Sequence, residues 1–406
     1  MADIDTDLCI VGGGPAGMIA GLLFARAGVR TTVLEKHADF LRDFRGDTVH
    51  PSTLTVFHEL GLLDELLDRP HQRVDRIGGR IAGEQLRIVD FTHLAVPAPY
   101  IALMPQWHFL DFVADVARRY PSFTLHRSCE ATGLIEEAGS VIGVRTGEGE
   151  IRSRLVLAAD GRHSTIRRDA GLPSRIIGAP MDVFWFRLPK TEQPENDSMG
   201  VFDSGRIFVL IDRGDYWQCA LVFPKGGADR IRSEGLDKFR DRVGAVGPET
   251  AEGADAITRW DDVKLLTVTV DRLEKWHKPG LQIIGDAAHA MSPIGGVGIN
   301  LAVQDAVAAA NVLAGAMAAG DDPDPLLHRI EDRRMLPTRL TQAMQKAIQD
   351  RVIAPLLEGA DPLERPPLIA RAIDRFPPLR RIPARAIGLG FRPEHVRSPK
   401  ASAHRP

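Results

Sequence analysis

The feature that most constrains the fold is a glycine cluster near the start of the chain. A short apolar run, residues 7–11, is followed by Gly12-Gly13-Gly14-Pro15-Ala16-Gly17 and then by helix-compatible residues up to Gly28. A second apolar run covers residues 31–35. This order predicts a β-α-β unit with two parallel strands. Parallel strands joined by a helical crossover imply an α/β architecture.

Within this cluster, the spacing Gly12-x-Gly14-x-x-Gly17 is typical of dinucleotide binding. Positions without side chains let a pyrophosphate approach the helix N-terminus, where unpaired N–H groups and the helix dipole favour an anion. Glu35 ends the second strand roughly twenty residues on, where an acid accepts hydrogen bonds from ribose hydroxyls. A tight glycine turn is the alternative, but strand, helix and acid occur in the required order. Glu35 favours NAD or FAD over NADP here.

The residue pattern changes in the middle of the chain. Between residues 177 and 270, aromatic and β-branched runs are separated by Gly and Asp turns, which predicts a mostly antiparallel sheet. The chain then returns to a buried strand, residues 281–284, a glycine-rich loop and an Ala-rich helix over about 298–319. We therefore expect a discontinuous nucleotide-binding domain with a second domain inserted in it. Beyond residue 321, we expect helices that are broken at Pro337.

The composition narrows the class of protein. With 406 residues, 44% of them hydrophobic and 26% charged, the chain can bury the core of two packed domains. A formal net charge of −3 gives no reason to bind nucleic acid. The three cysteines, Cys9, Cys129 and Cys219, lie far apart, which favours a reducing compartment. Because the N-terminus is acidic and its apolar run is short, we expect no signal peptide, no stable membrane insertion and a cytoplasmic location.

Two downstream motifs select FAD. Gly285-Asp286 follows the buried strand and precedes Pro293, Gly295, Gly296, Val297 and Gly298. A helix N-terminus aimed at a flavin stabilises the negative charge that reduction creates. This segment resembles the second FAD motif of the aromatic hydroxylases, in which the aspartate binds the ribityl chain and the loop faces the isoalloxazine. Gly296-Val297 departs from the commoner Gly-Gln-Gly form, and Asp286 alone could be a helix cap.

Asp160-Gly161, with Ser164 and Arg167, resembles the Asp-Gly motif of the same family. Softer matches are Arg45 ahead of His50-Pro51, and Gln106 at the start of an amphipathic helix. The alternatives are a solvated Arg45 and a Gln106 that only begins its helix. The resemblance implies FAD contacts from the following residues: Gly12, Gly14, Pro15, Ala16, Gly17, Glu35, Lys36, Arg45, Gln106, Asp160, Gly161, Arg167, Gly285, Asp286, Pro293, Gly298, Ile299 and Asn300.

From Asp5 to about Ala314, the chain thus resembles the group A FAD-dependent aromatic hydroxylases, which are flavoprotein monooxygenases with a p-hydroxybenzoate hydroxylase-like fold. The resemblance implies a Rossmann-like FAD-binding domain (GR2-type) over residues 1–175 and 271–325. It also implies an inserted, mostly antiparallel β-sheet substrate domain over 176–270, to which part of 70–105 contributes. Residues 326–406 would form C-terminal helices and a basic Pro/Arg-rich tail.

The resemblance implies that non-covalent FAD, NADPH or NADH as co-substrate, and O2 together hydroxylate an aromatic, phenolic or polycyclic small molecule through a flavin C4a-hydroperoxide. Rival activities are those of an oxidase, a dehydrogenase, a reductase or a halogenase of the same fold. The chain lacks the Trp-x-Trp-x-Ile-Pro segment of halogenases. A non-catalytic FAD-binding protein is disfavoured, because motifs are present around the reactive end of the flavin as well as around the phosphates.

The substrate wall is predicted from period-two alternation in the inserted sheet. One face of its last long run carries Trp217, Cys219, Leu221 and Phe223, which are candidate substrate contacts. Such alternation is more often that of an ordinary core than of a pocket wall. No metal-ligand spacing and no catalytic acid or base is identified, and we expect no metal. His289 is interpreted as a flavin neighbour. The basic tail could bind an anionic membrane surface, but its prolines favour packing or a homodimer contact.

Overall fold

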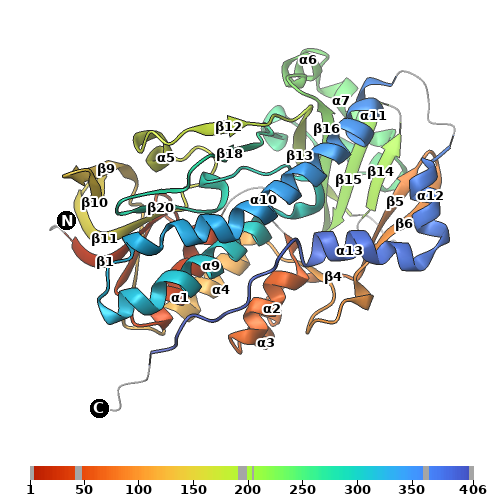
Figure 1. Ribbon diagram of the computed structural model, residues 1–406. Coiled ribbons are helices and arrows are strands. Elements are labelled where there is room, and N and C mark those ends of the chain that lie inside the picture. Colours follow the sequence, from red (N-terminus) through yellow and green to blue (C-terminus); the bar gives the residue numbers. More distant parts are fainter. Residues whose placement is uncertain (1–3, 42–47, 191–198, 204, 360–364, 402–406) are drawn as a thin grey trace.

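The computed structural model describes residues 4–41, 48–190, 199–203, 205–359 and 365–401 (Figure 1). Its largest sheet has the central order β19-β20-β11-β1-β2-β8, in which β1 (Ile4–Val11) pairs in parallel with β2 (Thr31–Glu35) and β11 (Gly149–Ala158). The crossover from β1 to β2 is α1 (Pro15–Arg26), as the glycine cluster predicted. The other strands of this sheet are β8 (Phe123–Arg127), β9 (Ala131–Glu137), β10 (Ser140–Thr146), β19 (His277–Lys278) and β20 (Leu281–Ile283).

Three helices pack together beside this sheet: α1, α4 (Gln106–Ala117) and α9 (Gly298–Ala319) (Figure 1). Buried residues cover every side of α9, as in a core helix, and Gly320 ends it in the left-handed conformation with φ 88°. Among the described residues, Ile294–Ala319 is the one helical stretch that is long and apolar enough to cross a membrane, but 72% of its apolar window is buried. Its contacts with α1 and with α10 (His328–Ile348) explain its apolar composition.

A second sheet has the order β17-β13-β16-β15-β14-β5-β6 and is antiparallel except for the parallel pair β14 and β5. Its first five strands by position are β17 (Lys264–Leu266), β13 (Met181–Pro189), β16 (Tyr216–Pro224), β15 (Arg206–Asp212) and β14 (Met199–Asp203). Its other edge is formed by β5 (Arg76–Ile81) and β6 (Glu84–Asp90). One face packs on α6 (Ala228–Ser233) and α7 (Leu236–Gly244), where rings such as Phe184 and Phe239 meet edge to face. The mixed α/β class is confirmed.

The predicted helix break at Pro337 is wrong. A single helix, α10 (His328–Ile348), runs through Pro337 and continues into a π turn, Gln349–Ile353, and α11 (Ala354–Glu358). Proline removes one backbone hydrogen bond, but Pro337 is buried and the Thr341 hydroxyl donates to its carbonyl at 2.9 Å. Tertiary packing of the buried face offsets the local cost, which local sequence alone does not show.

Short elements complete the described chain. They are α2 (Pro51–Glu59), α3 (Leu63–Leu67), α5 (Thr165–Asp169), α8 (Pro248–Ala251), α12 (Leu368–Arg375), α13 (Arg381–Gly388), β3 (Thr48–Val49), β4 (Gln72–Val74), β7 (Ile101–Leu103), β12 (Ser174–Ile176) and β18 (Asp271–Leu273). After α13, the chain runs back along the helices (Figure 1), where Arg26 donates to the Ser398 carbonyl and Asn311 to the His395 carbonyl.

Candidate functional site

A cavity of about 1770 Å³ opens between the carboxyl ends of the parallel strands and one face of the second sheet. Pockets for one drug-sized ligand usually measure about 300–1,000 Å³. This cavity is therefore large enough for two ligands side by side. Its lining divides into a polar half, made by the three glycine-containing motifs, and an apolar half, made by the second sheet and the C-terminal helices.

The first glycine motif forms a cradle at the N-terminus of α1. Gly12 has φ 104°, and a Cβ on Gly17 would lie 1.9 Å from the Gly12 carbonyl oxygen, so both positions require glycine. A Cβ on Gly14 would meet nothing within 4 Å, because Gly14 faces the cavity. No side chain caps α1 at Gly14. The helix N-terminus therefore presents N–H groups and its positive dipole end to open space, which suits the pyrophosphate of FAD.

Glu35 lies beside this cradle at the end of β2. Its carboxylate accepts the Gly13 N–H at 3.1 Å and the His37 N–H at 3.0 Å. These bonds hold a largely buried carboxylate at the cavity wall. Lys36 lines the cavity next to it. Glu35 therefore lies beside the cradle, and its contact with a ribose stays a prediction.

Asp160 follows β11 and caps α5. Its carboxylate accepts the Ser164 hydroxyl at 2.6 Å and the Thr165 N–H at 2.8 Å. Burial raises the pKa of Asp160, and these hydrogen bonds oppose the rise. Arg167, predicted to contact the cofactor, instead donates to Asp271 and to the Arg162 carbonyl. Arg167 does not line the cavity, and its guanidinium links α5 to β18 and to the backbone of the Asp160-Gly161 motif.

The second FAD motif forms the facing wall. Asp286 lines the cavity, and one of its carboxylate oxygens lies 3.6 Å from the Arg162 guanidinium, a partner that the sequence analysis missed. Gly295 and Gly296 have φ of 76° and 62°, a region that favours glycine. The Thr48 hydroxyl donates to the Gly296 carbonyl at 2.9 Å. No side chain caps α9, so this loop presents a second helix N-terminus to the cavity.

Most predicted cofactor residues thus meet around one cavity. Those that line it are Gly12, Gly14, Pro15, Ala16, Glu35, Lys36, Gln106, Asp160, Gly161, Asp286, Pro293, Gly295, Gly296, Gly298 and Ile299. Predicted residues outside its lining are Gly17, Arg167, Gly285, Val297 and Asn300. Asn300, for example, accepts from the His50 N–H and the Thr53 hydroxyl and braces the loop. Arg45 lies outside the described residues.

The predicted substrate face requires correction. Trp217, Cys219, Leu221 and Phe223 belong to the apolar core between the second sheet and its helices α6 and α7. The opposite face of β16 lines the cavity with Gln218, Ala220 and Val222. Period-two alternation separated the two faces of β16 correctly. It could not show which of the two faces packs against α6 and α7. Other residues of the cavity wall are Val183, Trp185, Phe202, Val209 and Ile211.

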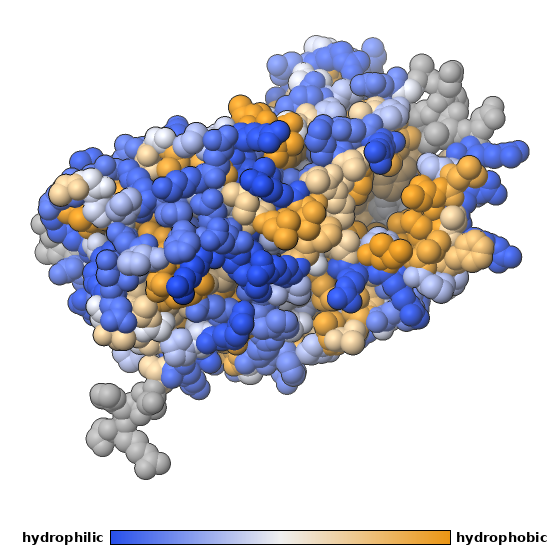
Figure 2. Space-filling view, viewed as in Figure 1, coloured by the Kyte–Doolittle hydropathy of each residue, from blue (hydrophilic) through white to orange (hydrophobic). Residues whose placement is uncertain are grey.

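The apolar half of the cavity opens beside α12. Ile369, Ala370 and Ile373 line it, whereas Leu368 and Phe376 are 81% and 60% exposed. Figure 2 shows hydrophobic residues gathered on both sides of a hollow where α12 lies. Across the cavity, α10 and the turn after it contribute further apolar side chains. Among the described residues, most of the lining here is apolar, and Arg351 is its charged member.

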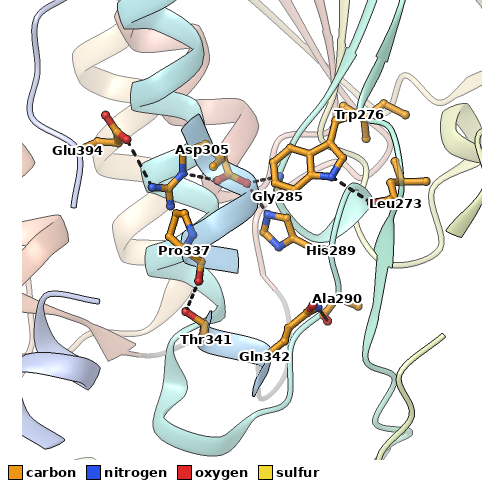
Figure 3. Close-up of polar contacts among 12 residues, drawn as sticks. Leu273, Trp276, Gly285, His289, Ala290, Asp305, Pro337, Thr341, Gln342 and Glu394 are labelled. Atoms are coloured by element: carbon orange, nitrogen blue, oxygen red, sulfur yellow. Dashed lines mark hydrogen bonds and ion pairs between the residues drawn. The ribbon is translucent and has the colours of Figure 1, made fainter. Parts of the chain in front are cut away.

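A buried charged network contacts the second motif at Gly285 (Figure 3). Asp305 on α9 accepts the Gly285 N–H at 3.1 Å, the His289 ring at 2.5 Å and the Arg334 guanidinium at 2.8 Å. Arg334 in turn pairs with Glu394 of the C-terminal segment. His289, interpreted as a flavin neighbour, is buried and outside the cavity lining. One charged residue in an apolar helix was the signal that could have revealed this network.

His50 joins three segments around the flavin-facing loop. Its backbone N–H donates to Asn300 at 3.0 Å, and its Nδ1 lies 2.8 Å from the Ile387 carbonyl. The side chain is fully buried, and burial lowers the pKa of His50 to about 4. The imidazole is therefore neutral in the folded protein at neutral pH, with its proton on Nδ1.

Acidification between about pH 6.5 and pH 4 should destabilise the protein through His50. Unfolded His50 binds a proton near pH 6.5, whereas the folded group does so only at about pH 4. Because the unfolded chain binds more protons in this window, the unfolding free energy falls as pH falls, by about 3 kcal/mol in total. Urea unfolding of the wild type and of His50→Asn between pH 7 and pH 4 measures this fall in unfolding free energy. Parallel profiles of the two proteins would contradict the prediction.

The sequence of the chain is similar to those of known proteins. Residues 5–344 match the family model described as FAD binding domain. The 6-methylpretetramide 4-monooxygenase of Streptomyces rimosus is 34% identical over 403 residues, which cover 97% of this chain and 94% of that protein.

Solved structures show the same fold. OxyS anhydrotetracycline hydroxylase from Streptomyces rimosus has a TM-score of 0.71 at 23% identity, covering 95% of this chain and 76% of its own. The p-nitrophenol 4-monooxygenase PnpA from Pseudomonas putida DLL-E4 has a TM-score of 0.71 at 20% identity, covering 95% and 94% of the two chains. At these identities, the likeness extends to the fold alone.

Proposed function

The chain belongs to the FAD-binding family of aromatic monooxygenases, and from this premise we propose that it hydroxylates a polycyclic phenolic molecule with O2 and NADH or NADPH. In the balanced reaction, NAD(P)H, a proton, O2 and an aromatic C–H give NAD(P)⁺, water and a phenolic C–OH. The observation that carries the proposal is one cavity whose polar half suits FAD and whose apolar half has room for an aromatic ring system.

The residues of the polar half would hold the cofactor. The N-terminus of α1 at Gly14 would receive the pyrophosphate, Glu35 a ribose and Asp286 the ribityl chain. Bound FAD would supply electron transfer from the nicotinamide nucleotide and activation of O2. The N-terminus of α9, behind Gly295 and Gly296, would favour negative charge on the reduced cofactor.

The apolar half would orient the substrate and exclude water. The sheet face around Ala220 and Val222 forms one wall, and α10 with α12 forms the other. Excluding water protects a labile oxidant from unproductive decay. The relative named for 6-methylpretetramide, which is 34% identical, supports a polycyclic substrate. Gln218, on the cavity face of β16, is the polar group that we propose as a substrate contact there.

Labelled oxygen tests the reaction type. Phenolic, quinolone and polycyclic compounds are first screened for those that accelerate NADH or NADPH oxidation by the purified yellow protein. We expect one atom of ¹⁸O from ¹⁸O2 in the product of a stimulating compound, measured by mass spectrometry. A dehydrogenated product with all of the oxygen recovered as hydrogen peroxide would establish an oxidase instead. A protein that binds no added FAD would overturn the whole proposal.

A further inference from the structure

Three glutamines on one side of α10 and the turn after it are buried. Gln342, Gln345 and Gln349 follow one another at spacings of three and four residues, which places them on one helical face. A buried amide that lacks partners costs about 1–3 kcal/mol. Such a row is therefore tolerated only where it finds partners. Gln345 and Gln349 find them in one neighbouring segment, and Gln342 bonds both that segment and β18.

That segment, residues 290–294, connects the Gly285-Asp286 turn to the flavin-facing loop. The Gln345 amide nitrogen donates to the carbonyls of Ser292 and Ile294, both at 2.9 Å, and its oxygen accepts the Ser292 N–H at 3.2 Å. Gln349 donates to the Ser292 hydroxyl at 2.9 Å. Gln342 donates to the Ala290 carbonyl at 3.3 Å and to the Asp271 carbonyl of β18 at 2.8 Å, and its oxygen accepts from the Arg272 guanidinium at 2.6 Å. Figure 3 shows Gln342 beside Ala290.

The segment has no strand or helix of its own between residues 290 and 293. Its buried backbone groups need partners that regular secondary structure would otherwise supply. The glutamines supply them, and they belong to the helix that presents Met344 and Ile348 to the apolar half of the cavity. One rigid helix therefore contacts both the support of the flavin-facing loop and the proposed substrate space.

We propose that Gln342, Gln345 and Gln349 are positioning residues that set residues 290–294 and, through them, the place of the Gly295–Gly298 loop against the flavin. This inference rests on the proposed location of FAD at that loop. The glutamines do not line the cavity, so they act through the backbone that they hold. A correctly placed α9 N-terminus stabilises reduced flavin more than oxidised flavin.

The sharpest test is Gln345→Met, which preserves side-chain length and removes the three hydrogen bonds. We expect FAD to bind about tenfold more weakly. We also expect the reduced form to be weakened about tenfold more than the oxidised form, which lowers the midpoint potential of bound FAD by about 30 mV for a two-electron couple. Absorbance titration of the apoprotein and equilibrium reduction with a reference dye measure these changes without any substrate.

Gln304→Met is the matched control, because Gln304 is also a buried glutamine but accepts the Glu394 N–H and bonds none of residues 290–294. It should leave the FAD affinity and potential within twofold and about 10 mV of the wild-type values. Gln349→Leu, which removes only the bond to the Ser292 hydroxyl, should give a smaller shift than Gln345→Met and replaces it if that variant does not fold.

The outcomes separate this inference from the proposed function. If the wild type binds FAD and the glutamine variants keep its affinity and potential, the positioning role is wrong. Equal shifts in Gln304→Met would also overturn it, because they would reflect general packing. If the wild type itself binds no FAD, the proposed cofactor site fails first. A potential lowered in Gln345→Met but unchanged in Gln304→Met supports the inference.

Discussion

Replacing Asp305 by alanine is expected to lower the unfolding free energy by about 3–5 kcal/mol, because it leaves buried cationic and N–H groups without their acceptor. Asp305 and Arg334 are 0% and 1% exposed, and the carboxylate also accepts the Gly285 N–H and pairs with His289. Glu394 would still pair with Arg334, but nothing would replace the acceptor at Gly285. FAD retention should fall as well. Urea unfolding and flavin release measure the two effects.

An exposed ion pair provides the control for Asp305. Asp237, 92% exposed, lies 2.9 Å from Arg240, and Asp237→Ala should cost less than about 1 kcal/mol. A loss of similar size in the two variants would contradict the assigned role of the buried network. Burial alone would raise the pKa of Asp305, but His289 and Arg334 hold it below its ordinary value. Its contribution is therefore complete above the unfolded pKa and is lost only as pH falls through the lower folded pKa.

Gly14→Ala should weaken FAD binding by roughly 10- to 100-fold while leaving the apoprotein as stable as the wild type. The backbone of Gly14 is extended, with φ −75° and ψ −177°, so alanine fits without strain. Its Cβ would meet nothing within 4 Å of the protein and would occupy the space proposed for the pyrophosphate. Losing one charge-assisted hydrogen bond, worth about 1.5–3 kcal/mol, accounts for this range.

Gly147→Ala is the matched substitution, because its Cβ would also meet nothing within 4 Å but Gly147 does not line the cavity. It should alter neither FAD affinity nor stability. Thermal unfolding of both apoproteins measures any loss of stability, and flavin fluorescence titration measures FAD affinity. A steric block at Gly14 lowers the affinity alone, whereas a disturbed fold lowers both. Unchanged FAD affinity in Gly14→Ala would place the pyrophosphate elsewhere.

Motifs that depend on local spacing were predictable from the sequence. The glycine cluster with Glu35 predicted β1, α1 and β2, and the Gly285-Asp286 motif predicted the turn into α9. Each needs only residues close in the chain, because backbone conformation, helix dipole and strand ends follow from local order. These segments meet at one cavity because the carboxyl ends of parallel strands share one edge of a sheet.

Two features depended on which elements pack together. The alternation in β16 defined two faces, but only the packing of α6 and α7 decided that Gln218 faces the cavity and Trp217 the core. Helix α10 continues through Pro337 because the packing of its buried face offsets the backbone hydrogen bond that proline cannot form.

The partners of the buried polar residues also come from distant parts of the chain. Asp305 bonds Arg334, which lies 29 positions away in the sequence. Gln345 bonds Ser292, which lies 53 positions away. Burial makes an isolated charge or amide costly, so the sequence alone determined that such residues need partners. Only the tertiary structure decided which partners those are, because hydrogen bonding depends on distance in space and not on separation along the chain.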